Sequence, residues 1–276
     1  GYYADYGGVS QFAKVWREGY AYTGEHSRYR RRRHGSSPRL NPPKQFVVFS
    51  QNHDQVGNRR LGDRLSSTLS PARHRMAAAA VLLSPFVPLL FMGEEYAETA
   101  PFQYFVSHTD PALIEAVRRG RRAEFAAFAW ESDVPDPQDE DTFHRSTLNH
   151  ALAERGRHRS LRAFYRELLA LRKRTPAIAR VNKETIQTTV FDSENVLMVR
   201  QWTAHDEVVL VFNFRDQVSA LDLPLPPGQW CQRLDSSDPR WDVPGPPDNP
   251  VVTAPGRVPI QLPATSVLFY RRLPDP

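Results

Sequence analysis

The stretch Gln45-Phe-Val-Val-Phe-Ser-Gln-Asn-His-Asp54 decides the fold class of this 276-residue chain. Residues 45–50 are a short run of apolar, β-branched and aromatic side chains without polar alternation. This pattern is typical of a strand that is buried on both faces of a parallel sheet. A polar cluster at residues 51–55 follows directly. The stretch therefore predicts a buried strand with polar chemistry at its carboxyl end.

A second apolar run repeats this arrangement at residues 86–92 and ends in Gly93-Glu94-Glu95. Between the two runs, Ser70-Pro71 is an N-cap followed by proline at the first helical position, and it predicts a helix over residues 72–83. Strand, helix and strand in this order indicate a βαβ unit. We therefore expect two parallel strands that each end in polar residues.

From residue 183 onward, short β-forming runs separated by turn residues replace the helical patterns. Apolar residues at helical spacing precede them at 9–20 and 160–174. The predicted strands are residues 184–191, 195–203, 207–214, 218–223, 258–262 and 266–272. They predict an antiparallel β-sandwich of about 95 residues. We place the domain boundary so that residues 1–180 form an α/β part and residues 181–276 the all-β domain.

Composition excludes several classes of protein. The chain is 40% hydrophobic and 24% charged, which is ordinary for a folded protein, with a net charge of +5. Its one cysteine, Cys231, excludes an internal disulfide framework and a cysteine-based zinc site. No run approaches the roughly 18–20 apolar residues of a membrane span, and no signal peptide is recognisable. We expect a cytoplasmic protein with no membrane partner, no cofactor and no catalytic metal.

Asn52, His53 and Asp54 are the strongest candidate site, because ligand chemistry in α/β folds gathers at the carboxyl ends of parallel strands. A histidine and a carboxylate at such a place can bind hydroxyls of a polar substrate, and the carboxylate can stabilise positive charge that develops on a sugar ring. The structural alternative is that Asp54 caps the next element and His53 fills a polar pocket. Glu94 holds the equivalent place after the second strand, with a helix-entry acid as its alternative.

Two further features carry weaker predictions. Tyr104 and Phe105 are loop aromatics whose faces suit stacking on sugar rings, with loop packing as the alternative. The basic run from Arg28 to His34 is the one feature that resembles a nucleic-acid-binding segment. Because the run is short and isolated, we interpret it as a solvated or acid-paired loop and expect no nucleic-acid partner.

The sequence around the first strand resembles the seventh-strand region of the α-amylase superfamily, glycoside hydrolase family thirteen. The matching residues are 46–58, and residues 89–96 resemble the eighth strand of the same barrel. The tract 116–122 and Pro135-Asp-Pro-Gln138 resemble more narrowly the malto-oligosyltrehalose trehalohydrolase subfamily. The resemblance implies the last two strands and helices of a (β/α)8 TIM barrel, followed by an antiparallel β-sandwich domain.

The resemblance also implies a retaining α-glycosidase that cuts the α-1,4 bond next to the trehalose end of maltooligosyl trehalose. Asp54 matches the transition-state stabiliser and His53 a residue that binds the sugar in the cleavage subsite. Asn52, Gln55, Glu94, Tyr104 and Phe105 are the other expected substrate-binding residues.

Nothing in the sequence matches the family's nucleophile or its general acid. A complete barrel needs about 250 residues, whereas about 180 precede the β module. We therefore expect a C-terminal portion whose partner is the missing N-terminal part, and which is inactive alone. The alternatives are another activity of the superfamily, such as glycogen branching or debranching, and a non-catalytic α-glucan-binding module.

Overall fold

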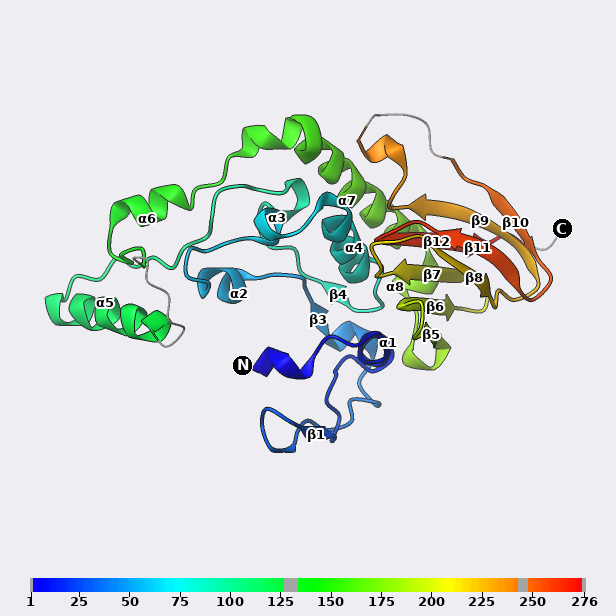
Figure 1. The fold of residues 1–276 in the computed structure, drawn as a ribbon, viewed down its shortest axis with the longest axis horizontal. Helices are drawn as coiled ribbons and strands as arrows, with labels where there is room; N and C mark the ends of the chain where they lie inside the picture. The colour runs from blue at the N-terminus through cyan, green and yellow to red at the C-terminus, as the bar shows by residue number, and fades with distance from the viewer. Residues whose placement is uncertain (1, 127–133, 243–247, 275–276) are drawn as a thin grey trace. The chain divides into compact units, whose positions relative to one another are not determined.

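The computed structural model describes residues 2–126, 134–242 and 248–274, and Figure 1 shows their helices and strands along the chain. The chain forms two compact units. The first comprises residues 1–48, 75–89 and 163–276, and the second comprises residues 49–74 and 90–162. This division differs from a single boundary at residue 180, which stays a prediction.

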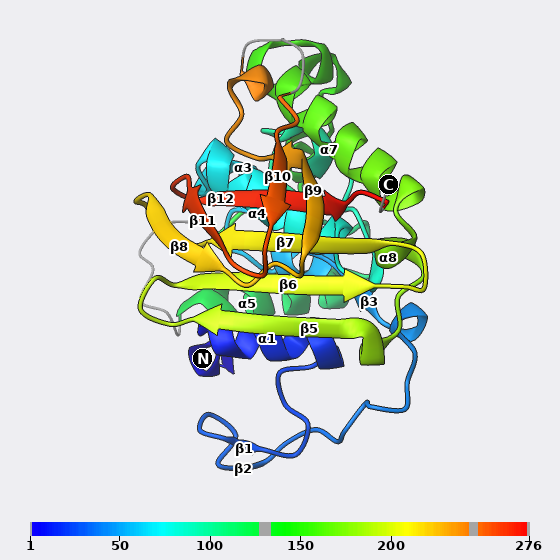
Figure 2. The ribbon, with the colours of Figure 1, turned by 90° about the vertical axis from the view of Figure 1, so that its right-hand side faces the viewer.

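The largest element of the first unit is a six-stranded antiparallel sheet with the strand order β10-β9-β12-β7-β6-β5 (Figure 2). A separate antiparallel pair, β11-β8, accompanies it. The strands of the sheet are β5 (Ile186–Phe191), β6 (Val196–Trp202), β7 (Glu207–Asn213), β9 (Gly228–Asp235), β10 (Val251–Ala254) and β12 (Ser266–Arg272). The pair consists of β8 (Ser219–Leu223) and β11 (Val258–Leu262).

A hydrophobic core lies between the large sheet and the β8–β11 pair. Val209 and Val211 of β7 belong to this core together with Leu268 of β12, and all three are at most 2% exposed. Leu223 of β8 and Leu262 of β11 are fully buried in the same core. Alternate residues of strands from both layers thus point inward, as in a β-sandwich. The predicted antiparallel sandwich is confirmed.

The other face of the large sheet is covered by α1 (Val9–Glu18), which lies beside β5 and β6 (Figure 2). The helix begins after Gly8 and ends at Gly19, whose φ of 99° is the left-handed conformation that favours glycine. Trp16 is 2% exposed and donates its indole N–H to the Gln201 side-chain oxygen at 2.8 Å. The buried indole therefore has a hydrogen-bond partner on the sheet.

The two predicted parallel strands exist but are short. β3 (Val47–Val48) pairs in parallel with β4 (Val87–Pro88), and α4 (Pro71–Leu82) lies between them in the chain. The prediction that both strands are buried on both faces is wrong, because Val47 is 57% exposed and Val87 40% exposed. Among the described residues this sheet has only these two strands, so no third strand pairs with either of them.

Arg172 fixes the chain that leads into β4. It lies in α7 (Gly156–Arg174), and its guanidinium donates to the carbonyl oxygens of Leu82, Ser84 and Phe86 at 2.5–2.9 Å. Leu82 is the last residue of α4, where the final turn of a helix leaves its acceptors unpaired, and Ser84 and Phe86 follow it. Burial of the guanidinium lowers the Arg172 pKa. One arginine thus satisfies three backbone acceptors, and no carboxylate of the described residues pairs with it.

The remaining described elements are the 16-residue helix α5, several shorter helices and a small hairpin. They are β1 (His26–Ser27), β2 (Arg32–Arg33), α2 (His53–Gly57), α3 (Leu65–Thr68), α5 (Pro111–Ala126), α6 (Glu140–Arg145) and α8 (Pro176–Ala179), with 3-10 turns at Tyr2–Asp5, Pro43–Gln45, Glu94–Tyr96, His150–Glu154, Lys183–Thr185 and Pro239–Trp241. None of the helices described in this chain combines the length and the apolar character that crossing a bilayer requires.

Candidate functional site

The predicted site begins at Asn52, which is the N-cap of α2. Its backbone is extended, with φ −148°, and its side-chain oxygen accepts the backbone N–H of Gln55 at 2.8 Å. This is the ordinary capping role of asparagine, which satisfies one unpaired donor of the first helical turn. Asn52 therefore positions the next residues, and the Gln55 side chain that follows is exposed.

His53 and Asp54 form the first turn of α2 and project into solvent. The exposed fractions of their side chains are 72% and 74%, and His53 Nε2 lies 3.4 Å from Asp54 Oδ1. An exposed contact of this kind contributes little to stability. Neither residue fills a buried pocket, so both side chains are open to a ligand. A carboxylate beside an imidazole presents an acceptor and a ring nitrogen to neighbouring hydroxyl groups.

Glu94 is placed differently from Asp54. Its side chain is buried, with the residue 2% exposed, and its Oε2 accepts the backbone N–H of Phe91 at 3.0 Å. The preceding residue, Gly93, has φ 83° and turns the chain into the 3-10 helix Glu94–Tyr96. This burial favours the structural alternative of a helix-entry acid over direct contact with a substrate.

The two loop aromatics keep part of their surface exposed. Tyr104 is 40% exposed, and the Arg121 guanidinium carbon lies 4.8 Å from its ring centroid. Phe105 is 36% exposed and makes an edge contact with Phe143 at a centroid distance of 5.3 Å. Each ring thus packs against a neighbour and keeps part of its surface exposed, so the contacts agree with loop packing and leave sugar stacking as a prediction.

Glu98 is a buried carboxylate that the sequence did not indicate. It is fully buried, and Oε1 accepts the N–H groups of Thr99 and Ala100 at 2.7 and 2.8 Å. Oε2 accepts the N–H of Asn149 at 2.7 Å and the Tyr96 hydroxyl at 3.0 Å. Burial by itself would raise the Glu98 pKa, but these hydrogen bonds outweigh it and hold the pKa below its ordinary value.

Arg64 is a second buried residue in the same unit. It is 2% exposed and donates to the carbonyl oxygens of Met92 and Ala100, each at 2.7 Å. Burial lowers the Arg64 pKa, and the charge of Glu98 opposes that shift. Arg64 and Glu98 together fix the segment 92–100, which carries Glu94. The described residues contain no group of three or more histidine, cysteine, aspartate or glutamate side chains arranged for a metal ion.

Comparison with known proteins points to one enzyme group. A family described as "Alpha amylase, C-terminal all-beta domain" matches residues 191–272. Malto-oligosyltrehalose trehalohydrolase of Rhizobium sp. (strain M-11) is 43% identical over 227 residues, which are 81% of this chain and 37% of that protein. The Arthrobacter ramosus protein of the same name is 48% identical over 182 residues, 65% of this chain and 32% of that protein.

A solved structure supports the same assignment. A putative alpha amylase from Salmonella typhimurium superposes with a TM-score of 0.79 at 32% identity, over 99% of this chain and 43% of that chain. The chain therefore spans less than half the length of the relatives that it matches. By these similarities in sequence and in fold, the chain belongs to the malto-oligosyltrehalose trehalohydrolases of the α-amylase superfamily, glycoside hydrolase family thirteen, and corresponds to their C-terminal portion.

Proposed function

We propose that the chain is part of a glycoside hydrolase that cleaves the α-1,4 bond next to the trehalose end of maltooligosyl trehalose and releases trehalose. The names of its relatives support the substrate class. The exposed pair His53 and Asp54 is the observation that carries the proposal, because both side chains are open to solvent. We also propose the boundary at residues 180 and 181, and a cytoplasmic location.

In this proposal Asp54 acts on the transition state. Glycosidic cleavage passes through a sugar ring with oxocarbenium-like positive charge. The Asp54 carboxylate stabilises this charge and accepts hydrogen bonds from ring hydroxyls, while His53, 3.4 Å away, binds the neighbouring hydroxyl. Since the charge is small in the ground state, the contribution of Asp54 belongs mainly to kcat.

The nucleophile and the general acid come, in this proposal, from polypeptide outside the chain. Retaining cleavage needs two carboxyl groups about 5–5.5 Å apart. Glu94 is a poor candidate for either, because its carboxylate is buried and holds the backbone of Phe91. We therefore expect the 276-residue chain to show no hydrolysis by itself.

Complementation tests the proposal. The chain is combined with the N-terminal part of the Rhizobium relative, and free trehalose released from maltooligosyl trehalose is measured. Asp54→Asn is expected to lower kcat by about 10²-fold or more with a smaller change in KM. Asp63→Asn is the matched control, because Asp63 is a half-exposed aspartate whose one ion pair among the described residues is a 3.6 Å surface contact with Arg59. Full activity of the Asp54 variant rejects its role, and a new α-1,6 branch as product indicates a branching enzyme instead.

The second candidate function is binding of α-glucans without catalysis, which the exposed ring of Tyr104 favours. The isolated chain is titrated with maltooligosaccharides by calorimetry. Binding that Tyr104→Ala removes, and that the exposed control Tyr29→Ala keeps, supports a binding module. A chain that binds no glucan and gains activity on complementation leaves the hydrolase as the function.

A further inference from the structure

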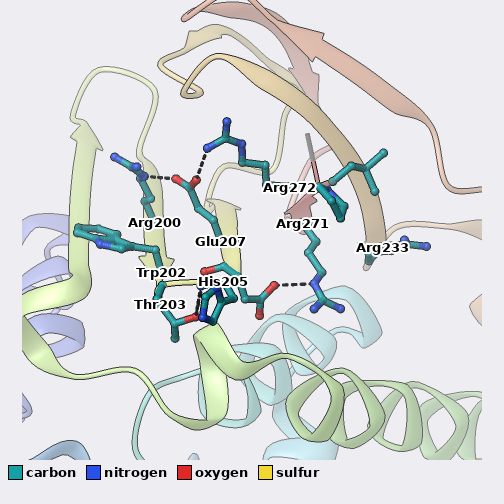
Figure 3. A pocket seen from close by; sticks show the side chains of 12 residues that line it. Arg200, Trp202, Thr203, His205, Glu207, Arg233, Arg271 and Arg272 are labelled. Atoms are coloured by element: carbon teal, nitrogen blue, oxygen red, sulfur yellow. Dashed lines mark hydrogen bonds and ion pairs between the residues drawn. The ribbon is translucent and has the colours of Figure 1, made fainter. Parts of the chain in front are cut away.

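We propose that the β-domain binds a phosphate-bearing anion in a pocket between β6, β7, β9 and β12. The pocket has a volume of about 510 Å³, and Figure 3 shows its lining side chains. Arg200 and Trp202 lie on one side of it and Arg233 on the other, with Arg271 and Arg272 between them. This proposal is independent of the proposed hydrolase activity, because it concerns other residues and another ligand.

The lining of this pocket carries more positive than negative charge. Four arginines line it, whereas Glu207 and Asp206 are its only two carboxylates among the described residues. Arginine is always protonated at physiological pH. The formal charge of these six side chains is therefore four minus two, or +2. A hollow lined by an excess of one charge concentrates ligands of the opposite charge.

Both carboxylates already have guanidinium partners. Glu207, whose side chain is 11% exposed, accepts from Arg200 Nε at 2.5 Å and from Arg272 Nη1 at 3.3 Å. Asp206, whose side chain is 3% exposed, accepts from Arg271 Nε at 2.7 Å and from the backbone N–H of Ala177 at 3.0 Å. Neither carboxylate is therefore available to neutralise Arg233 on the other side of the pocket.

Arg233 and Arg271 keep donors that these pairs do not use. Each guanidinium has five N–H groups, and Arg271 gives only its Nε–H to Asp206. Arg233 is exposed and makes no hydrogen bond or ion pair within the described part of the chain. Arg233 and Arg271 also line a neighbouring pocket of about 350 Å³. Unused planar donors in a positive hollow match the oxygens of a phosphate group, which guanidinium binds in bidentate geometry.

Trp202 adds an apolar surface to the same pocket. Its ring is half-buried, and the Arg200 guanidinium carbon lies 4.8 Å from the ring centroid. A sugar ring stacks on such an aromatic face while its phosphate reaches a guanidinium. Two ligands carry the phosphate group that these arginines would bind: inorganic phosphate and a sugar phosphate.

Calorimetric titration of the full 276-residue chain tests the site with three probes. These are inorganic phosphate, glucose 6-phosphate and, as the neutral control, maltose. Arg233→Gln is expected to weaken binding of the phosphate probes about fivefold to tenfold. Since Arg233 is exposed and unpaired in the described chain, its replacement leaves the fold intact. Arg257→Gln is the matched control, because Arg257 is exposed on the same domain and lines neither pocket.

Each outcome decides the proposal. Saturable phosphate binding that weakens with added salt and with Arg233→Gln, but not with Arg257→Gln, supports it. Tighter binding of the sugar phosphate than of inorganic phosphate, with the difference lost in Trp202→Ala, identifies a sugar phosphate as the source, whereas equal affinities identify free phosphate. The proposal is overturned if neither phosphate probe binds, if maltose binds and the phosphates do not, or if the two arginine variants weaken binding equally.

Discussion

Replacing Glu98 with glutamine tests the buried hydrogen-bond cluster of the second unit. One carboxylate oxygen accepts the N–H groups of Thr99 and Ala100, and the other accepts the N–H of Asn149 and the Tyr96 hydroxyl. In either orientation of the glutamine amide, its NH₂ faces at least one backbone N–H. A buried unsatisfied donor costs about 1–3 kcal/mol, and loss of the charge weakens the other bonds. We expect local stability to fall by about 3 kcal/mol.

Hydrogen exchange followed by mass spectrometry measures this loss directly. A change of about 3 kcal/mol corresponds to roughly 100-fold faster exchange of the peptides covering 96–104 and 146–152. Glu95→Gln, at a partly exposed neighbouring position, is the control. Because the pKa of Glu98 lies below the ordinary 4.5, the stabilisation is complete above about pH 4.5 and is lost as the pH falls below that value. Exchange in Glu98→Gln within threefold of the control would refute the reasoning.

Three further predictions concern stability. Gly93→Ala should lower the melting temperature, because the φ of Gly93 is 83° and an added Cβ would lie 2.8 Å from the Glu98 Cβ. Gly120→Ala is the opposite case, because an added Cβ in α5 would meet no atom within 4 Å. It should raise the melting temperature, and the free energy of unfolding should increase by about 1 kcal/mol. Arg172→Met removes three hydrogen bonds to backbone carbonyls, so urea unfolding should show a loss of about 3 kcal/mol, and an unchanged midpoint would contradict that role. Burial lowers the pKa of His74 to about 4, so its NMR titration should have a midpoint near pH 4 rather than 6.5, and the folded state should lose stability as the pH falls from 6.5 to 4.

Much of the β-domain was predictable from the sequence, because its strands are contiguous runs of β-forming residues. β11 and β12 have the predicted bounds, β5, β7 and β8 differ from them by one or two residues at one end, and β6 differs by one residue at each end. β9 and β10 were missed. β9 mixes buried Trp230 with exposed or half-buried polar residues, and its pairing with β12 shifts register at Phe269 and Tyr270. Where the pairing of a strand is irregular, buried and exposed residues do not alternate regularly along it, so the sequence lacks the pattern that predicts a strand.

The two parallel strands show that an apolar run in the sequence does not by itself determine the length or the burial of a strand. Residues 45–50 and 86–92 were predicted as buried strands, but ladder pairing covers only two residues in each. Pro88 has no N–H to donate, which limits the ladder on the β4 side. An apolar run indicates what a strand is suited to contact, whereas burial depends on the neighbours that are present.

The candidate site was predictable only where its residues are adjacent in sequence. Asn52, His53 and Asp54 follow one another, so their position after a strand could be recognised. Glu98 could not, because its partner Asn149 is 51 residues away and its other acceptor contacts depend on a local turn. Sequence reasoning detects contiguous chemistry, and it misses side chains whose importance arises from distant backbone groups.

The bond between the Trp16 indole and Gln201 has a consequence for synthesis on the ribosome. The two residues are separated by 185 positions, so α1 emerges long before the sheet face that buries it. At about 5–20 residues per second, this amphipathic helix is made roughly 10–40 seconds before its partner strand. During that interval the apolar face of α1, which includes Ala13 and Trp16, has no sheet to pack against.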